Sequence, residues 1–249
     1  EDEIGELAQK FNEMLDQMEE LKQKEYQAKQ LLNRAEYKAL QAQVNPHFLY
    51  NTLDTMASIA EIRNCPEVSH MSQSLALIFR YSLNMKDPFS TVENEIAHLK
   101  NYIYVMDMRM HDNIQYTFDV DEMTLKSKLP RLSLQPIVEN AINHGLRNKR
   151  GKKKIGIQIK REQMDLVICI EDNGIGLDTS AINESLRKNE LDFVEKGNSI
   201  GLHNINARLK MLYGNQYGMH LESTLGEGTK VFMILPDSGE DSNNEEKDI

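Results

Sequence analysis

Cysteine is scarce in this sequence, and its absence from any pattern excludes several kinds of site. Of 249 residues only Cys65 and Cys169 are cysteines, and neither belongs to a Cys-x-x-Cys pair or lies at a metal-ligand spacing from a histidine. We therefore predict free thiols in a reducing compartment. Five histidines also lack metal spacing, and we assign them no function: His70, His98, His111, His203 and His220.

Long apolar runs are missing too. No stretch reaches the length of about 20 apolar residues that crosses a bilayer, and no signal peptide precedes the first helical pattern. The chain begins Glu-Asp-Glu, without an initiator methionine, and enters directly on a helical repeat. We interpret it as a soluble fragment of a longer protein, in which a membrane segment could lie upstream.

An excess of positive charge is also absent. The formal net charge is −10, and residues 237–249 alone carry six acids and one base with no apolar cluster. We expect this acidic tail to be disordered. The rest of the chain, at −5, has no overall basic footprint that would indicate nucleic acid binding. The single basic run, Arg147–Lys154, is interpreted as a solvated loop, and the alternative is that it raises the local positive potential beside an anionic ligand or meets an acidic partner.

Helical periodicity dominates the first half of the chain. From Leu7 to Ala42 apolar and small residues recur at spacings of four and three, with Glu25 as the one charged exception. Such a heptad seam predicts a coiled coil and, most simply, a dimer. We expect the helix to continue to about Ile59 and to end at Asn64-Cys65-Pro66.

A second helix over Val68–Ser82 would complete an antiparallel hairpin, and two hairpins form a four-helix bundle. A third helix is predicted from about Thr91 to Met110. Beyond residue 112 the pattern changes to a mixed sheet with helices on one face. Strands are expected at 114–120, 154–160, 166–171, 219–223 and 230–235, helices at 132–146 and 202–213, and at most one short helix within 179–198.

A proline interrupts the first helix immediately before His47. Proline removes a backbone donor and kinks a helix, and a neutral imidazole is a usable nucleophile near neutral pH. We interpret His47 as a site of covalent modification. On this stretch alone, a histidine packed at a helix–helix seam is the commoner alternative.

Three further patterns lie in the second half. The helix over 132–146 carries a polar stripe of Asn140, Asn143 and His144, whose amides and imidazole suit a phosphate and a magnesium ion. Asp172-Asn173-Gly174-Ile175-Gly176 follows a strand and would form a tight turn with an acceptor beside it. Gly197 to Leu202 opens a helix, where unpaired N–H groups attract anions. Each has a plainer alternative: a solvent-facing stripe, an ordinary turn and a helix cap.

Taken together, and with Gly226-Glu227-Gly228-Thr229 before the last strand, these patterns resemble the N, G1 and G2 boxes of the nucleotide-binding fold. That fold is shared by histidine kinases, gyrase-type ATPases, Hsp90 and MutL. The stretch Asn45-Pro46-His47-Phe48-Leu49-Tyr50-Asn51 makes the resemblance narrower. The whole chain resembles the cytoplasmic part of a sensor histidine kinase of the LytS/YesM type, and its first residues resemble the tail of a HAMP module.

The resemblance implies an α+β multidomain protein. Residues 1–18 would be the tail of the HAMP signalling helix, 19–112 the coiled coil and the dimerisation and phosphotransfer helices, 113–236 a Bergerat-type α/β sandwich that binds ATP, and 237–249 the acidic tail. It further implies a homodimer, an upstream transmembrane sensor in a bacterial cell membrane, and a response regulator receiver domain as partner.

The same resemblance implies roles for single residues. His47 would accept the phosphoryl group from ATP, and Asn51, one helical turn on, would orient its ring. Asn140 would ligate Mg²⁺, with Glu139 beside it as a candidate catalytic side chain and Asn143 and His144 near the phosphates. Asp172 would bind the adenine amine, Gly174 and Gly176 would line its pocket, and Thr229 would support the contact. Five residues would wrap the phosphates: Gly197, Asn198, Ser199, Gly201 and Leu202.

Two departures from the family pattern keep alternatives open. Many histidine kinases place an acid directly after the phosphorylated histidine, whereas this chain has Phe48, so an ATP-binding dimeric scaffold without phosphotransfer is one alternative. A gyrase- or Hsp90-like hydrolase is the other. Those enzymes place a water-activating glutamate four residues before the metal-binding asparagine, and Pro136 at that position speaks against hydrolysis.

Overall fold

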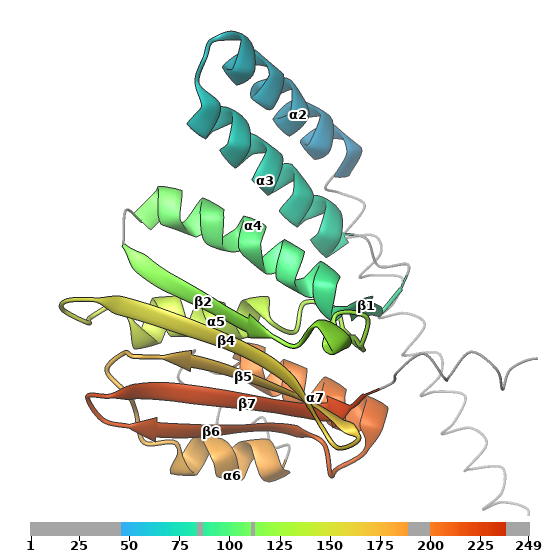
Figure 1. Cartoon of the computed structure of the whole chain (residues 1–249), viewed down its shortest axis with the longest axis vertical. Coiled ribbons are helices and arrows are strands. Elements are labelled where there is room, and N and C mark those ends of the chain that lie inside the picture. The colour runs from blue at the N-terminus through green and yellow to red at the C-terminus, as the bar shows by residue number, and fades with distance from the viewer. Residues whose placement is uncertain (1–45, 84–86, 111–112, 189–199, 238–249) are drawn as a thin grey trace, which may run out of the picture. The chain divides into compact units, whose positions relative to one another are not determined.

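A computed structural model describes residues 46–83, 87–110, 113–188 and 200–237 (Figure 1). The heptad seam of 7–42, the HAMP-like stretch 1–18, residues Gly197, Asn198 and Ser199, and the tail after Asp237 lie outside these residues. The chain from Tyr50 onward belongs to one compact unit, whereas Pro46–Leu49 belong to another whose remainder is not described. Among the described helices, none is long and apolar enough to span a membrane.

Two antiparallel helices form the first described feature, α2 (Pro46–Ile62) and α3 (Pro66–Leu83). The turn between them is a Schellman motif: Cys65 N–H donates to the Ala60 carbonyl at 2.8 Å and Asn64 N–H to that of Glu61 at 3.0 Å. Asn64 takes the left-handed conformation that this motif requires, with φ at 54°. The helix end expected at Asn64-Cys65-Pro66 is therefore confirmed.

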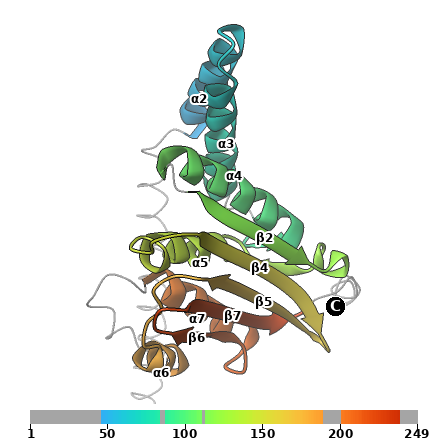
Figure 2. The same ribbon diagram turned by 60° about the vertical axis from the view of Figure 1, so that its left-hand side comes forward.

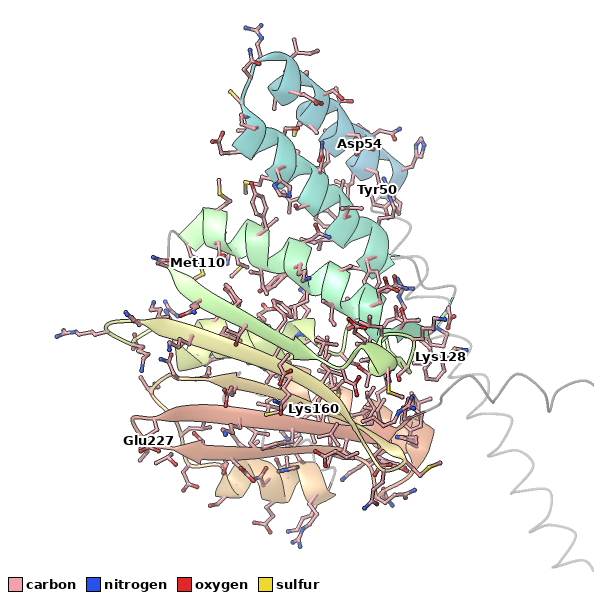
Figure 3. The ribbon with its side chains drawn as sticks, viewed as in Figure 1. Tyr50, Asp54, Met110, Lys128, Lys160 and Glu227 are labelled. Atoms are coloured by element: carbon pink, nitrogen blue, oxygen red, sulfur yellow. The ribbon has the colours of Figure 1, made fainter. Side chains whose placement is uncertain are left out.

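Contacts between α2 and α3 involve polar groups as well as small apolar ones. Tyr50 Oη donates to the Phe79 carbonyl at 3.4 Å, and Arg80 lies 3.8 Å from Asp54 (Figure 3). Ala57, Ala60 and Ala76 are the buried apolar residues of the pair. Because their methyl groups are small, the two helices bury little large apolar surface against each other.

Helix α4 (Val92–Met110) follows the short strand β1 (Phe89–Thr91), which pairs antiparallel with β3 (Lys128–Pro130). Neither strand was predicted from the sequence, because three residues are too few to show an alternating pattern. The helix itself is confirmed. Its inward face, including Leu99 and Ile103, joins the same hydrophobic core as the sheet, although α4 lies before the expected border at residue 112.

A five-stranded sheet follows, in the order β2-β4-β5-β7-β6, with β2 parallel to β4 and all other neighbours antiparallel. Its strands are β2 (Ile114–Val120), β4 (Lys153–Glu162), β5 (Asp165–Asp172), β6 (Gly218–Thr224) and β7 (Gly228–Pro236). These are the strands that the alternating patterns predict. The expected α+β class, a helical region followed by a sheet domain, is confirmed.

Three helices cover one face of this sheet (Figure 2). They are α5 (Gln135–Asn140), which continues into a π-helical turn over Ala141–Gly145, α6 (Ser180–Lys188) and α7 (Ile200–Tyr213). Alternate side chains of the central strands point into the core beneath them, as period-two burial requires. Those of β4 and β5 are fully buried: Ile155, Ile157, Ile159, Leu166, Ile168 and Ile170.

The helix expected over 132–146 is shorter and less regular than predicted. Leu132 has a φ of 57°, outside the helical region, and α5 begins only at Gln135, with Pro136 in its first turn, where no N–H is needed. At the other end Leu146 N–H donates to the Ala141 carbonyl five residues back, at 2.8 Å. The last turn is therefore wider than an α turn.

The free edge of the sheet at β6 is closed by side chains. Asn183 of α6 pairs with both backbone groups of Leu221: its Nδ2 donates to the carbonyl at 2.8 Å and its Oδ1 accepts the N–H at 2.9 Å. Asn206 of α7 accepts the N–H of Met219 at 2.9 Å and donates to the Leu186 carbonyl at 2.8 Å. An unpaired strand edge invites other strands, so these two amides both satisfy and block it.

Candidate functional site

A cavity of about 410 Å³ lies between α5 with its π turn on one side and the end of β5 on the other. Apolar side chains form most of its wall, among them Ile137, Ile170 and Val231. Seven of the residues selected from the sequence line it together: Asn140, Asn143, His144, Asp172, Gly176, Leu202 and Thr229. A mostly apolar cavity with a few convergent polar groups is the usual form of a small-molecule site.

Asp172 is the best-defined polar group of the cavity. It ends β5, and its Oδ1 accepts the N–H of Gly174 at 2.7 Å. Burial raises the pKa of this carboxyl, while the N–H groups of Gly174 and Thr229 and the charge of Lys149 oppose the rise. A half-buried carboxylate at the wall of a mostly apolar pocket gains from any further hydrogen-bond donor, so it suits a ligand with an amine.

Two glycines are required by close backbone packing around Asp172. A side chain on Gly174 would place a Cβ 2.2 Å from the Gly145 carbonyl oxygen and 2.5 Å from Asp172 Oδ1. Gly176 has a φ of 66°, and a Cβ there would lie 2.1 Å from the Thr224 carbonyl oxygen. Both positions therefore exclude other residues. Gly176 lines the cavity, where its backbone can lie against a ligand, whereas Gly174 does not line it.

Asn140 ends α5, while Asn143 and His144 lie in the π turn. The Nδ2 atom of Asn140 is buried and has no hydrogen-bond partner among the described residues. An orphaned buried amide costs free energy unless a ligand satisfies it. An amide at this wall offers a donor to phosphate oxygens and an oxygen ligand to Mg²⁺, so the residues present fit that pair.

Other selected residues lie elsewhere. Gly201 is in the first turn of α7, where an added Cβ would lie 3.4 Å from that of Pro136. Glu139 does not line the cavity; after burial, its charge is the main cause that raises the pKa of Tyr102 on α4. Both His47 and Asn51 lie on α2 with exposed side chains.

Some residues that line the cavity were not selected from the sequence, notably Gly145, Arg147 and Asn148. Arg147 opens the basic run that was interpreted as a solvated loop, and part of that run instead reaches the site. The signal was present in the sequence, because the run starts at Arg147, three residues after the polar stripe ends at His144. A run of basic residues does not show which of their side chains line a cavity, so the sequence did not single out Arg147.

Two protein-family models match this chain, and a curated relative is similar to nearly all of it. Residues 35–114 match the family model described as histidine kinase, and residues 128–239 match the model described as histidine kinase-, DNA gyrase B- and HSP90-like ATPase. The sensor histidine kinase YesM of Bacillus subtilis is 32% identical over 236 residues, which are 95% of this chain and 39% of the relative. The chain therefore spans less than half the length of this relative.

Two further relatives are named as a sensor histidine kinase and a sensor protein. The sensor histidine kinase YpdA of Escherichia coli is 34% identical over 84% of this chain and 36% of its own length. The sensor protein LytS of Oceanobacillus iheyensis is 33% identical over 84% of this chain and 35% of its own length. Among solved structures, the histidine kinase domain of a blue-light activated histidine kinase from Erythrobacter litoralis is 17% identical, with a TM-score of 0.45 over 81% of this chain and 93% of that one.

Proposed function

Because the chain belongs to the sensor histidine kinase family, we propose that it binds ATP with Mg²⁺ in the cavity between α5 and β5 and transfers the terminal phosphoryl group to His47. The observation that carries this proposal is the pairing, in one cavity, of the half-buried carboxylate of Asp172 with the orphaned amide of Asn140. The carboxylate of Asp172 would select a base with an exocyclic amine, and the amide of Asn140 would contact the phosphates of the nucleotide.

Different residues of this chain would bind the adenine base and the phosphates of the nucleotide. Asp172 accepts a hydrogen bond from the adenine amine, with the backbone at Gly176 close against the base. Asn140 offers its oxygen to the metal and its nitrogen to a phosphate oxygen, and Arg147 adds positive charge at the cavity wall. When bound, Mg²⁺ neutralises charge that develops on the phosphate oxygens.

His47 would receive the phosphoryl group on the ring nitrogen that carries no hydrogen. A P–N bond forms as the bond between the terminal phosphorus and its bridging oxygen breaks, ADP leaves, and the ring then loses the proton on its other nitrogen. The side chain is exposed on α2, as an acceptor that must meet a separate domain requires. The adjacent Phe48 is 65% exposed and offers no carboxylate as a base.

We also propose that the chain acts as a homodimer, and that the phosphoryl group passes on to an aspartate of a response regulator. Large apolar side chains are exposed along α2 and α3, a pattern that marks an interface. They are Phe48, Met56, Ile59, Ile62, Val68, Leu77 and Phe79. A transmembrane sensor upstream of residue 1 would supply the signal in the longer protein.

Labelling with ATP that carries a radioactive terminal phosphate tests the proposal. The wild-type chain should incorporate acid-labile, alkali-stable label, and His47→Gln should bind nucleotide normally but incorporate none. Asp172→Asn should weaken nucleotide affinity about 10- to 100-fold, because it removes a charged acceptor. His70→Gln, a change at an exposed histidine of α3, is the matched control and should label as the wild type does. Label that persists in His47→Gln would refute the acceptor.

The outcomes also separate the alternatives. A scaffold that only binds ATP would show nucleotide affinity without label in the wild type. A hydrolase would release phosphate steadily without forming a labelled protein, although Pro136 leaves it no acid four residues before Asn140.

A further inference from the structure

Glu95 is a fully buried carboxylate on α4, with an exposed fraction of 0%. Backbone groups satisfy it. Its Oε1 accepts the N–H of Leu132 at 2.7 Å, and its Oε2 accepts those of Ser133 at 2.9 Å and Leu134 at 3.2 Å. A buried charge is tolerated only when donors surround it, and here three consecutive amides do so.

These three amides stand immediately before α5. Leu134 caps the helix but has no side-chain bond to its first turn, so α5 lacks an N-cap of its own. Leu132 has a φ of 57°, a strained conformation for a leucine, which surrounding contacts must hold in place. Glu95 therefore fixes the backbone of the turn that leads into α5, whereas a local cap residue would accept N–H groups of the first helical turn itself.

The held turn is close to the nucleotide site in the chain. Asn140 ends α5 only six residues after Leu134, and Asn143 and His144 follow in the π turn. A six-residue helix is too short to be stable by itself, so its position depends on what fixes its ends. Glu95 holds the turn before its first residue, and the π turn that continues its other end is bonded to the turn after β5, where Ile175 N–H donates to the Gly145 carbonyl at 3.0 Å.

Side chains from further elements meet at the same place. Tyr81 of α3 donates its hydroxyl to Glu95 Oε1 at 2.5 Å, and the guanidinium of Arg131 lies 4.1 Å from the centre of the Tyr81 ring. On α4, His98 Nε2 contacts Gln135 Oε1 at 2.6 Å, and on α7 Arg208 donates to Ser133 Oγ at 3.2 Å. The turn before α5 is thus fixed by a network that draws on α3, α4 and α7.

We propose that Glu95 is a positioning residue for the nucleotide site, acting through the turn Leu132–Leu134 to set the place of α5 and hence of Asn140. The inference rests on the proposed function, since it concerns the same site. Glu95 does not line the cavity and touches no bound group; its effect passes through backbone amides. A group that only stabilised the fold would change the melting temperature and leave nucleotide affinity in the folded protein unaltered.

The variant Glu95→Gln tests this in the whole 249-residue chain. The amide keeps the size of the side chain, but its NH₂ group cannot accept, so at least one backbone N–H loses its partner. We expect the affinity for Mg²⁺–ADP, measured by titration calorimetry well below the melting temperature, to fall about tenfold or more. Glu93→Gln, an exposed acid two residues earlier on α4, should leave the affinity unchanged.

A Glu95→Gln protein that melts earlier but binds Mg²⁺–ADP as tightly as wild type overturns the inference and leaves the proposed function standing. If wild-type protein fails to bind the nucleotide, the proposed function itself fails. The two failures are therefore distinguishable in one set of titrations.

Hydrogen exchange on the wild-type chain tests, without any variant, whether the turn Leu132–Leu134 is coupled to the nucleotide site. Coupling between two sites is reciprocal, so nucleotide binding must also stabilise the turn that Glu95 holds. Mg²⁺–ADP should slow exchange at the amides of Leu132, Ser133 and Leu134 more than at the amides of Thr124 and Ser127, a buried turn in the same unit. Equal slowing in both turns would contradict the proposal.

Discussion

Two titratable side chains, the half-buried Asp172 and the buried His98, show how burial at single positions shifts pKa values in this molecule. Burial raises the pKa of the Asp172 carboxyl and lowers the pKa of the His98 imidazole, because each shift favours the neutral form. At Asp172 the N–H groups of the following turn counteract burial. At His98 the bond to Gln135 and the charge of Glu95 do so, whereas Arg131 adds to the lowering.

His98 makes stability depend on pH in a direction that can be worked out. Its pKa is lower in the folded chain than in the unfolded chain, so as the pH falls below about 6.5 the unfolded state takes up the proton first. Stability that is present at higher pH is therefore lost between the unfolded pKa and the lower folded pKa. His98 Nδ1 is buried with no partner among the described residues, so no acceptor there offsets protonation.

Urea unfolding at about pH 7.5 and about pH 5.5 measures this effect. We expect the free energy of unfolding of wild-type protein to fall more between the two values than that of His98→Gln, which has no group to titrate at this position. The variant starts less stable because its bond to Gln135 changes, so only the difference between the two pH values is compared. Parallel losses in both proteins would show that His98 carries no part of the pH dependence.

At the scale of elements, side chains on neighbouring helices complete what the backbone leaves open. Asn183 satisfies both backbone groups of Leu221 at the β6 edge, in the manner of one residue of an added strand. Replacing it with alanine leaves a donor and an acceptor unpaired beneath α6. Each such group costs about 1–3 kcal/mol when buried.

We therefore expect Asn183→Ala, which unpairs two such groups, to lower the free energy of unfolding by roughly 2–6 kcal/mol, as measured in denaturant. Asn204→Ala, at an exposed position of α7, is the control and should change stability little, since exposed positions are usually near neutral. An Asn183→Ala protein as stable as the control would mean that water satisfies the edge equally well.

Local patterns predicted the regular elements well and the irregular ones poorly. Alternation in 114–120, 154–160 and 166–171 predicted strands because one face of each is buried by helices. The same reasoning treated 132–146 as one regular helix, since residues three or four apart share a face. The π turn changes that spacing after Asn140, and nothing in a 3.6-residue period announces it.

The candidate site was predictable where a motif is local. Asp172 and Gly176 follow one strand directly, and Asn140, Asn143 and His144 lie on consecutive turns, so short stretches identify them. Contacts between distant segments left no such signal. Glu95 lies 37 residues before Leu132, and in the sequence it is one acid among several in the first turn of an ordinary helix.

At the scale of the whole molecule, the described part divides its apolar surface unevenly. The sheet domain buries its large side chains in one core, whereas the α2–α3 hairpin buries mainly alanine and serine and leaves Met56, Ile59 and Ile62 half exposed or more. A pair of helices with so little interior gains stability by covering that face with another copy. Self-association should therefore depend on this surface.

Ile59→Glu tests the dependence. A carboxylate placed in the middle of an apolar interface loses its hydration on association, so we expect the dimer to dissociate at concentrations at least about tenfold higher than wild type requires. Analytical ultracentrifugation over a range of concentrations measures this. Gln163→Glu adds one negative charge in the exposed turn between β4 and β5, outside α2 and α3, and should associate as wild type does. Equal dissociation of both variants would argue against this face as the interface.

The carboxylate of Glu95 has a practical consequence for anyone who recombines relatives of this protein. A chimera joined at residue 112 would take Glu95 and Tyr81 from one parent and the three amides before α5, with Arg131, from the other. A junction at residue 112 lies between α4 and β2 and interrupts neither element. It nevertheless takes Glu95 and the backbone amides that donate to it from different parents. A seam placed before Tyr81 instead inherits the whole set from one parent, so compatibility follows this buried anion and not the borders that hydrophobic patterns suggest.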